Sequence, residues 1–252
     1  MAQKEILMLS AIVLTRNEER NIEHCLASLS WADELLVVDS GSTDATVALA
    51  QKYGATILEH PFTDFASQRN FAMQQAKGDW VLFLDADERI TLELEEEIRR
   101  VISQETKTIP ACVYAIPRHT YFFGKRLRFS DARHDAPIRL FPKRDVCWTQ
   151  PVHETITTAL PCRRLQNPML HYSTRDYDHY RQKVREYVPL ELITMREKGV
   201  RPTFFHVLWR PIAKFFYLYF WRLGILDGVT GLQYAILSAY YTLVKYWRYF
   251  NS

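Results

Sequence analysis

The chain has 252 residues, of which 48% are hydrophobic and 24% are charged, with 8 glycines and 11 prolines. This composition suits one globular domain, or one domain with an appendage, and excludes a disordered, collagen-like or coiled-coil protein. The net charge of +3 divides unevenly, because residues 1–105 carry 9 Lys and Arg against 19 Asp and Glu while residues 106–252 carry 23 against 10. We therefore expect the two parts to meet different partners, or each other.

The first 20 residues contain one apolar run and lack the small-residue cleavage site of a secretory signal. They predict a buried strand, and we expect the protein in the cytoplasm. Cys25, Cys112, Cys147 and Cys162 are too widely spaced for a disulfide scaffold or a Cys-x-x-Cys zinc site. We expect all four cysteines to be buried and reduced.

Four short apolar runs alternate with three segments of helical periodicity. The runs are residues 6–14, 35–39, 56–58 and 80–85, and the helical segments are residues 18–30, 45–53 and 65–76. Continuous apolar character is typical of strands buried on both faces, so the alternation predicts an α/β fold with a mostly parallel, doubly wound sheet and flanking helices. Ligands of such sheets bind beyond the carboxyl ends of the strands, where Thr15, Asp39, Asp85 and Asp87 are expected.

Basic and aromatic residues dominate the rest of the chain. Residues 118–144 contain eight Lys and Arg interleaved with aromatic side chains, which suits a groove for an anionic ligand and would also suit RNA. Residues 203–250 contain 16 of the 34 aromatic residues, five Lys and Arg and one acid, Asp227. Their longest uncharged stretch, residues 229–244, has 16 residues, fewer than the roughly 20 that span a bilayer.

This C-terminal pattern predicts two apolar, basic-flanked helices with a break near residues 224–231. Such helices are typical of an anchor that lies in the plane of a membrane. The alternative is a hydrophobic hairpin that packs on a second subunit, and the two can hold together.

Two groups of polar residues follow predicted strands. The segment LFLDADER places Asp85 and Asp87 where they can hold a divalent cation and leave positions open for a diphosphate. Thr15, Asn17 and Glu18 follow the first strand and can read the edge of a nucleobase, although Asn17 could also cap the next helix. The sequence contains no Gly-x-Gly-x-x-Gly and no Gly-Lys-Ser/Thr motif, so the dinucleotide and nucleoside-triphosphatase fingerprints are absent.

The ordered segments TRNEE, VVDSGSTDAT, FASQRNFA and GDWVLFLDADE, within residues 8–90, resemble the nucleotide-sugar-binding half of family 2 glycosyltransferases of the GT-A fold. The later segments IRLF, WTQPVHE and LHYS, followed by the aromatic basic tail, resemble the bacterial subgroup that adds glucose or a related hexose to the lipopolysaccharide inner core. UDP-glucose is the usual donor of that subgroup.

The resemblance implies roles for matching residues in donor binding. Thr15, Glu18 and Asp39 match positions that contact the base and ribose, and Arg69 matches an arginine near the nucleotide. Arg139 is a candidate contact for the diphosphate or for an acceptor phosphate, because a guanidinium group pairs bidentately with phosphate oxygens.

The resemblance also implies a metal site. Asp85 matches the first aspartate of the metal motif, which contacts ribose or metal, and Asp87 matches the aspartate that binds Mg²⁺ or Mn²⁺ between the phosphates. His171 is a candidate for closing this site, or else a structural histidine. The cation would neutralise charge on the departing nucleoside diphosphate.

Similar enzymes invert the anomeric configuration in one displacement and need a base for the acceptor hydroxyl. Glu154 is our candidate, since it is the only carboxylate between Asp145 and Asp176. His153, Asp131 and Asp135 are the alternatives.

We expect a GT-A domain in residues 1–200, with a nucleotide-sugar-binding half (1–105) and an acceptor-binding half (106–200), and an amphipathic helical region in residues 201–252. The expected partners are a nucleotide-sugar, with a UDP-sugar foremost, a lipid-linked oligosaccharide, a membrane surface and a second copy of the chain, but no nucleic acid. The expected location is peripheral, on the inner face of the cytoplasmic membrane.

Four alternative functions remain open at this stage. A polyprenyl-phosphate glycosyltransferase would share the fold and the Asp-x-Asp motif. A nucleotidyltransferase would show a Gly-rich phosphate loop with a lysine, and a receiver-like module would show an acidic pair after its first strand. TRNEERN has neither the Gly-rich loop nor the lysine, and Thr15-Arg16-Asn17 does not supply the acidic pair. The last alternative is a membrane-associated binding module without catalysis.

Overall fold

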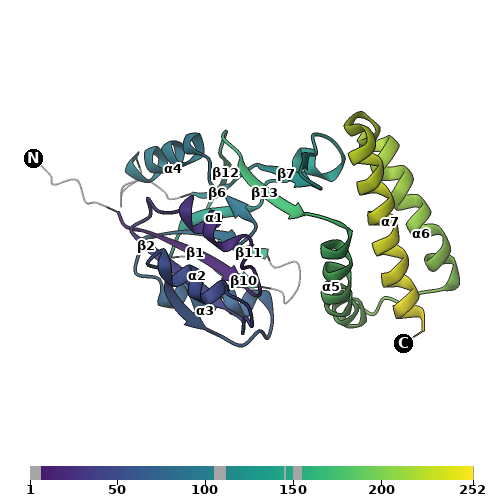
Figure 1. The fold of residues 1–252 in the computed structure, drawn as a ribbon, viewed down its shortest axis with the longest axis horizontal. Coiled ribbons are helices and arrows are strands. Elements are labelled where there is room, and N and C mark those ends of the chain that lie inside the picture. Colours follow the sequence, from purple (N-terminus) through teal and green to yellow (C-terminus); the bar gives the residue numbers. More distant parts are fainter. Residues whose placement is uncertain (1–6, 105–111, 145, 150–154, 252) are drawn as a thin grey trace, which may run out of the picture. The chain divides into compact units, whose positions relative to one another are not determined.

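The computed structural model describes residues 7–104, 112–144, 146–149 and 155–251 (Figure 1). The chain forms two compact units. Unit 1 comprises Met1–Arg118 and Ala136–His171, and unit 2 comprises His119–Asp135 and Tyr172–Ser252. The boundary expected between residues 200 and 201 is a functional division and stays a prediction.

Unit 1 is built on a seven-stranded sheet in the order β12-β6-β9-β4-β1-β2-β3. The strands are β1 (Leu9–Thr15), β2 (Glu34–Asp39), β3 (Thr56–Glu59), β4 (Trp80–Asp85), β6 (Val113–Ala115), β9 (Ile138–Pro142) and β12 (Cys162–Arg164). Neighbours from β4 to β3 run parallel, whereas β9 is antiparallel to both β4 and β6. The predicted mostly parallel α/β sheet is therefore confirmed.

Helices cover both faces of this sheet (Figure 1). They are α1 (Ile22–Ala27), α2 (Thr46–Lys52), α3 (Phe65–Gln75) and α4 (Leu92–Gln104). Residues of α1, α2 and α4 join the core on one face, and residues of α3 join the core on the other. In β4, Leu82 and Leu84 belong to the first core while Val81 and Phe83 belong to the second. Burial on both faces is the reason that the strand is apolar throughout.

Outside the large sheet, the described residues form six further strands. They are β5 (Glu88–Arg89), β7 (Arg118–Phe122), β8 (Lys125–Arg126), β10 (Cys147–Thr149), β11 (Thr155–Thr157) and β13 (Met169–Thr174). In unit 1, β5 pairs antiparallel with β13 and β10 with β11. In unit 2, β7 and β8 form a hairpin.

Unit 2 is mainly helical. Its helices are η1 (Ser130–His134), α5 (Tyr177–Glu197), α6 (Phe204–Phe216), η2 (Tyr217–Trp221), η3 (Gly224–Asp227) and α7 (Gly228–Phe250). Sequence reasoning did not identify α5, whose first turn is capped by Asp176 accepting from His179 N at 2.8 Å. Among the described residues, no helix combines the length and the apolar character needed to cross a bilayer.

The predicted break between the last two helices is confirmed, and two glycines permit a close approach of the backbone beside it. The polypeptide turns through η2 and η3, and α6 then packs along α7. A Cβ atom on Gly231 would overlap the carbonyl oxygen of Gly224. We call α6, η2, η3 and α7 together the helical hairpin.

One expectation about the cysteines is wrong in part. Cys25 and Cys112 are buried, but Cys147 and Cys162 are exposed. Both exposed residues lie in three-residue strands, β10 and β12, and β12 is at an edge of the large sheet. A strand at the edge of a sheet has a neighbouring strand on one side only, so its side chains are less covered. The spacing of cysteines along a sequence does not show which strand lies at an edge.

Candidate active site

Three predicted site residues lie at the carboxyl edge of the parallel sheet. Thr15 is in register with Asp39, and Leu14 is in register with Asp85. Thr15 and Asp39 are almost fully buried, whereas the Asp85 side chain keeps 39% of its surface exposed. The residues that sequence analysis assigned to one edge are therefore close together.

Asn17 connects the loops that follow β1 and β2. Its backbone has a φ of 55°, in the left-handed region, which Asn tolerates better than most residues. Asn17 Oδ1 accepts a hydrogen bond from Thr43 N at 2.8 Å, and Asn17 N donates to Ser42 Oγ at 2.8 Å. Helix α1 begins later, with Asn21 at its N-cap. The alternative that Asn17 caps this helix is therefore wrong.

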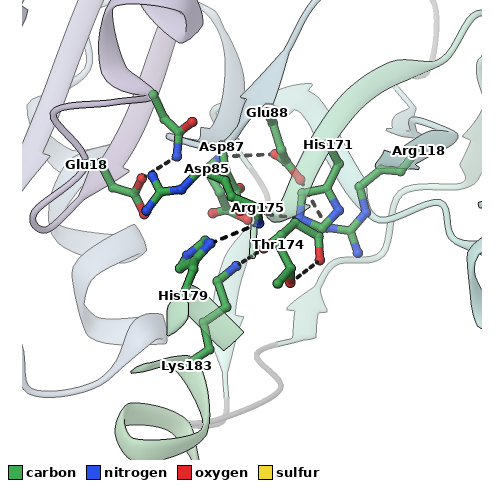
Figure 2. Close-up of polar contacts among 12 residues, drawn as sticks. Glu18, Asp85, Asp87, Glu88, Arg118, His171, Thr174, Arg175, His179 and Lys183 are labelled. Atoms are coloured by element: carbon green, nitrogen blue, oxygen red, sulfur yellow. Dashed lines mark hydrogen bonds and ion pairs between the residues drawn. The ribbon is translucent and has the colours of Figure 1, made fainter. Parts of the chain in front are cut away.

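Asp39 and Glu18 also shape these loops. Asp39 Oδ2 accepts from Gly41 N at 3.0 Å and from Ser42 N at 2.8 Å. Glu18 Oε2 accepts from Asn21 Nδ2 at 2.7 Å (Figure 2). These bonds hold the carboxylates of Asp39 and Glu18 against their own loops. Contact with a nucleotide stays a prediction for Thr15, Asn17, Glu18 and Asp39.

Asp85 lies between two guanidinium groups. Its Oδ1 is 3.1 Å from Arg69 Nη2, and its Oδ2 forms an ion pair with Arg139. Partial burial alone would raise the pKa of Asp85, but the charges of Arg139 and Arg69 outweigh it and hold the pKa well below its usual range. Asp85 is therefore a carboxylate at any physiological pH.

Glu88 is fully buried and completes a charged network that sequence analysis missed. Glu88 Oε1 accepts from Arg139 Nη2 at 2.7 Å and from Arg118 Nη1 at 3.0 Å, and Glu88 Oε2 accepts from Asp85 N at 3.0 Å. Burial alone would lower the pKa of Arg139, but Asp85 and Glu88 raise it. A third carboxylate directly after the Asp-x-Asp motif was the available signal for Glu88.

Arg69 is held by aromatic rings as well as by Asp85. Its guanidinium carbon is 4.7 Å from the ring centroid of Trp148 and 5.3 Å from that of Phe83. Arg69 is 3% exposed, and a cation over aromatic faces is attracted by their negative electrostatic potential. The side chain is therefore fixed in the orientation in which it meets Asp85.

Asp87 and His171 come together although 84 positions separate them in the sequence. Asp87 lies in the turn between β4 and β5, and β13 places His171 in register with Glu88. His171 Nε2 is 3.5 Å from Asp87 Oδ2 (Figure 2). In the part of the chain that the structure describes, no three His, Cys, Asp or Glu side chains form a metal-binding group.

The donor atoms of this pair fit a divalent cation that is shared with a ligand. A carboxylate oxygen suits Mg²⁺ and Mn²⁺, and an imidazole nitrogen suits transition metals. Mg²⁺ sites often combine one or two carboxylates with water and substrate phosphates rather than a full protein cage. Metal binding by Asp85, Asp87 and His171 stays a prediction.

The candidate bases lie in different parts of the chain. Glu154 and His153 lie outside the described residues. Asp131 belongs to unit 2, where its carboxylate is 3.0 Å from Lys214 Nζ and 3.4 Å from Arg222 Nε. Two cations therefore already engage Asp131. Asp135 is the last residue of the same segment of unit 2.

Comparisons with known proteins identify the family of the chain. The model of glycosyl transferase family 2 matches residues 10–165. The lipopolysaccharide core biosynthesis glycosyltransferase LpsC of Rhizobium meliloti (strain 1021) is 30% identical over 251 residues, covering 92% of this chain and 91% of LpsC. An uncharacterized glycosyltransferase of Rickettsia bellii (strain RML369-C) is 25% identical, covering 92% of this chain and 82% of that protein.

A solved structure shares the fold. The crystal structure of S. aureus TarS 1–349 in complex with UDP-GlcNAc matches with a TM-score of 0.50 and 17% identity, over 96% of this chain and 92% of that one.

Proposed function

Because the chain belongs to glycosyl transferase family 2, we propose that it is an inverting glycosyltransferase that moves a hexose, with glucose foremost, from a nucleotide-sugar to a lipid-linked acceptor. The observation that carries the proposal is the assembly of Asp85, Asp87 and His171 at the carboxyl edge of the sheet. The name of LpsC supports an acceptor in the lipopolysaccharide core. A lipid-linked acceptor would place the protein on the inner face of the cytoplasmic membrane.

The proposed donor is a UDP-sugar, with UDP-glucose foremost, and the TarS complex with UDP-GlcNAc supports this class of donor. Thr15, Asn17, Glu18 and Asp39 would contact the base and ribose. The Thr15 hydroxyl is buried and has no hydrogen-bond partner within the described ranges. Buried polar groups are normally satisfied, so a ligand atom at this edge would complete its hydrogen bonding.

Arg69 and Arg139 would stabilise the diphosphate. Arg69 and Arg139 pair with Asp85, and Arg118 and Arg139 pair with Glu88, so these guanidinium groups are positioned by the chain itself. Charge that is positioned before the reaction is effective because nothing has to reorganise as negative charge develops on the leaving group.

Asp87 and His171 would hold Mg²⁺ or Mn²⁺, with Asp85 in contact with the ribose or the metal. When bound, the cation supplies positive charge that neutralises the departing nucleoside diphosphate. The chain's own contribution is to hold the Asp87 carboxylate and the His171 ring together through the pairing of β5 with β13.

Glu154 is the proposed general base. The acceptor hydroxyl gives its proton to the Glu154 carboxylate while its oxygen forms a bond to the anomeric carbon. The bond from that carbon to the nucleoside diphosphate breaks on the opposite face, so the configuration inverts.

Thermal unfolding with ligands tests the donor and metal sites. The melting temperature is measured with nucleoside diphosphates and UDP-sugars, with and without Mn²⁺. A ligand at a hundred times its dissociation constant adds about 2.7 kcal/mol to the free energy of unfolding. We expect UDP and UDP-glucose to raise the melting temperature, and Mn²⁺ to increase the shift.

Asp87→Ala should abolish transfer and the Mn²⁺-dependent increase while leaving the fold intact. Glu96→Ala is the matched control, because Glu96 is an exposed carboxylate on α4 of the same unit. A full Mn²⁺ effect in Asp87→Ala would contradict the metal site. The absence of a shift with every nucleotide would contradict the donor site.

Glu154→Gln tests the base. The amide cannot accept the proton, so we expect transfer from UDP-glucose to stop while the nucleotide-induced rise in melting temperature is unchanged. Transfer at the wild-type rate would show that another residue is the base. Asp135 and His153 would then be the next residues to substitute.

A further inference from the structure

Exposed large apolar side chains gather on the helical hairpin of unit 2. Of the 24 such side chains in the described part of the chain, 18 lie between Phe204 and Phe250. Trp221 is 80% exposed, Val229 69% and Leu226 61%. Contiguous apolar patches of this kind on a soluble protein mark a contact with another protein or with a membrane.

On α6 these side chains form a continuous stripe. Phe205, Trp209, Ile212 and Phe216 are all exposed and follow one another at intervals of three or four residues, the spacing that aligns side chains on one face of a helix. Val207 and Pro211, on the other side, are buried. Trp221 and Leu226, in η2 and η3 at the turn of the hairpin, are exposed as well. We call Phe205, Trp209, Ile212, Phe216, Trp221 and Leu226 the apolar surface.

Cationic side chains lie beside the turn of the hairpin. The backbone of residues 128–130 is bonded to the turn, because Arg128 N and Phe129 N donate to Asp227 at 2.9 and 3.0 Å, and Ser130 N donates to Arg222 O at 2.9 Å. Helix η1 packs on η2. Arg128 and Arg133, on this segment, are both exposed.

Two acidic side chains close to these cations already have partners. Asp227, the only acid in residues 198–252, accepts the two backbone N–H groups described above, and Asp131 is paired with Lys214 and Arg222. Unit 2 contains 16 Lys and Arg against 8 Asp and Glu, a net charge of +8. Unit 2 is therefore cationic as a whole, and the segment bonded to the turn of the hairpin carries two of its exposed cations, Arg128 and Arg133.

We propose that unit 2 docks on an anionic lipid leaflet through the apolar surface, with Arg128 and Arg133 at the headgroup phosphates. Apolar side chains enter the boundary between headgroups and acyl chains, and cations at that depth pair with phosphates. The segment that carries Arg128 and Arg133 thus belongs to the docking surface and is bonded to the hairpin. This inference rests on the proposed lipid-linked acceptor, which such docking would bring within reach.

Charge favours a leaflet over a second copy of the chain as the occupant. A two-fold contact places the same surface of both copies face to face, which would add the +8 of one unit 2 to that of another. Anionic headgroups neutralise this charge instead.

The test is co-sedimentation of the full-length protein with vesicles of phosphatidylcholine mixed with phosphatidylglycerol, and with vesicles of phosphatidylcholine alone. We expect strong binding to the anionic vesicles, weaker binding to the neutral ones and a loss of binding as salt is raised. Trp221→Ser and Leu226→Ser should each lower binding several-fold. Leu92→Ser is the matched control, because Leu92 is 77% exposed but lies on α4 of unit 1.

The cations are tested by the double variant Arg128→Gln/Arg133→Gln. Removing two positive charges should lower the partition coefficient of the protein onto anionic vesicles by roughly tenfold or more. Arg163→Gln/Arg164→Gln removes the same charge from exposed positions of β12 in unit 1 and should bind as wild type. Equal binding of all variants would overturn the proposal, as would a concentration-dependent dimer that forms without lipid and is lost in Leu226→Ser.

For each variant, the melting temperature is also measured with and without UDP. The rise in melting temperature that UDP causes tests the proposed function separately from vesicle binding. Loss of the UDP effect with vesicle binding retained overturns only the transferase. Vesicle binding that is absent in the wild type, with the UDP effect retained, overturns only the docking.

Discussion

Glu88 has no exposed surface, yet three donors surround its carboxylate: Arg118, Arg139 and the N–H of Asp85. A buried charge is tolerated only when it is paired in this way. Through Arg139, Glu88 is connected to Asp85, which stands at the edge of the sheet. We infer that Glu88 positions the arginines of the site rather than touching a ligand.

Glu88→Gln keeps the shape of the side chain and removes its charge, which leaves Arg118 and Arg139 incompletely paired. We expect the free energy of unfolding to fall by about 3 kcal/mol. Glu95→Gln, which breaks the exposed pair with Arg99, should change it by less than about 1 kcal/mol. Denaturant unfolding measures both variants, and equal stabilities would show that the buried charge is dispensable.

The helical hairpin and the segment of residues 119–135 depend on each other. Lys214 and Arg222 pair with Asp131, and Asp227 accepts from the backbone of residues 128 and 129. Phe122 also packs edge-on against Tyr234 of α7. The hairpin and residues 119–135 therefore belong to the same compact unit.

A chain that ends after residue 200 should consequently lose order beyond the cut. We expect amide hydrogen exchange in residues 119–135 to become much faster, because their partners on the hairpin are removed, while exchange in β4 stays slow. Mass spectrometry of exchanged peptides measures both regions. Unchanged protection at residues 127–130 would contradict the dependence on the hairpin.

At the scale of the whole molecule, the charge asymmetry follows the two units. Unit 1 has a net charge of −5 and contains the carboxylates of the candidate active site, whereas unit 2 has a net charge of +8 and contains the apolar surface. Dividing the sequence at residue 105 gives a larger difference in net charge between the two parts. That division does not match the two units, because unit 2 combines two separate segments of the chain.

The sequence by itself determined the sheet and the edge that carries Asp85 and Asp87. Strands buried on both faces must be apolar throughout, and parallel strands bring their carboxyl ends to one edge. The resemblance in residues 8–90 added the family, which the comparisons confirmed. The aromatic, weakly acidic C-terminal region likewise predicted two helices with a break, because amphipathic periodicity is local.

The contacts between side chains that are distant in the sequence depend on the folded chain. His171 reaches Asp87, and Arg118 and Arg139 reach Glu88, through the register of strands that are far apart in the sequence. The joining of residues 128–130 to the turn of the hairpin has the same origin. Local patterns report burial and periodicity, whereas such pairings depend on how the whole chain packs, so no spacing along the sequence could have predicted them.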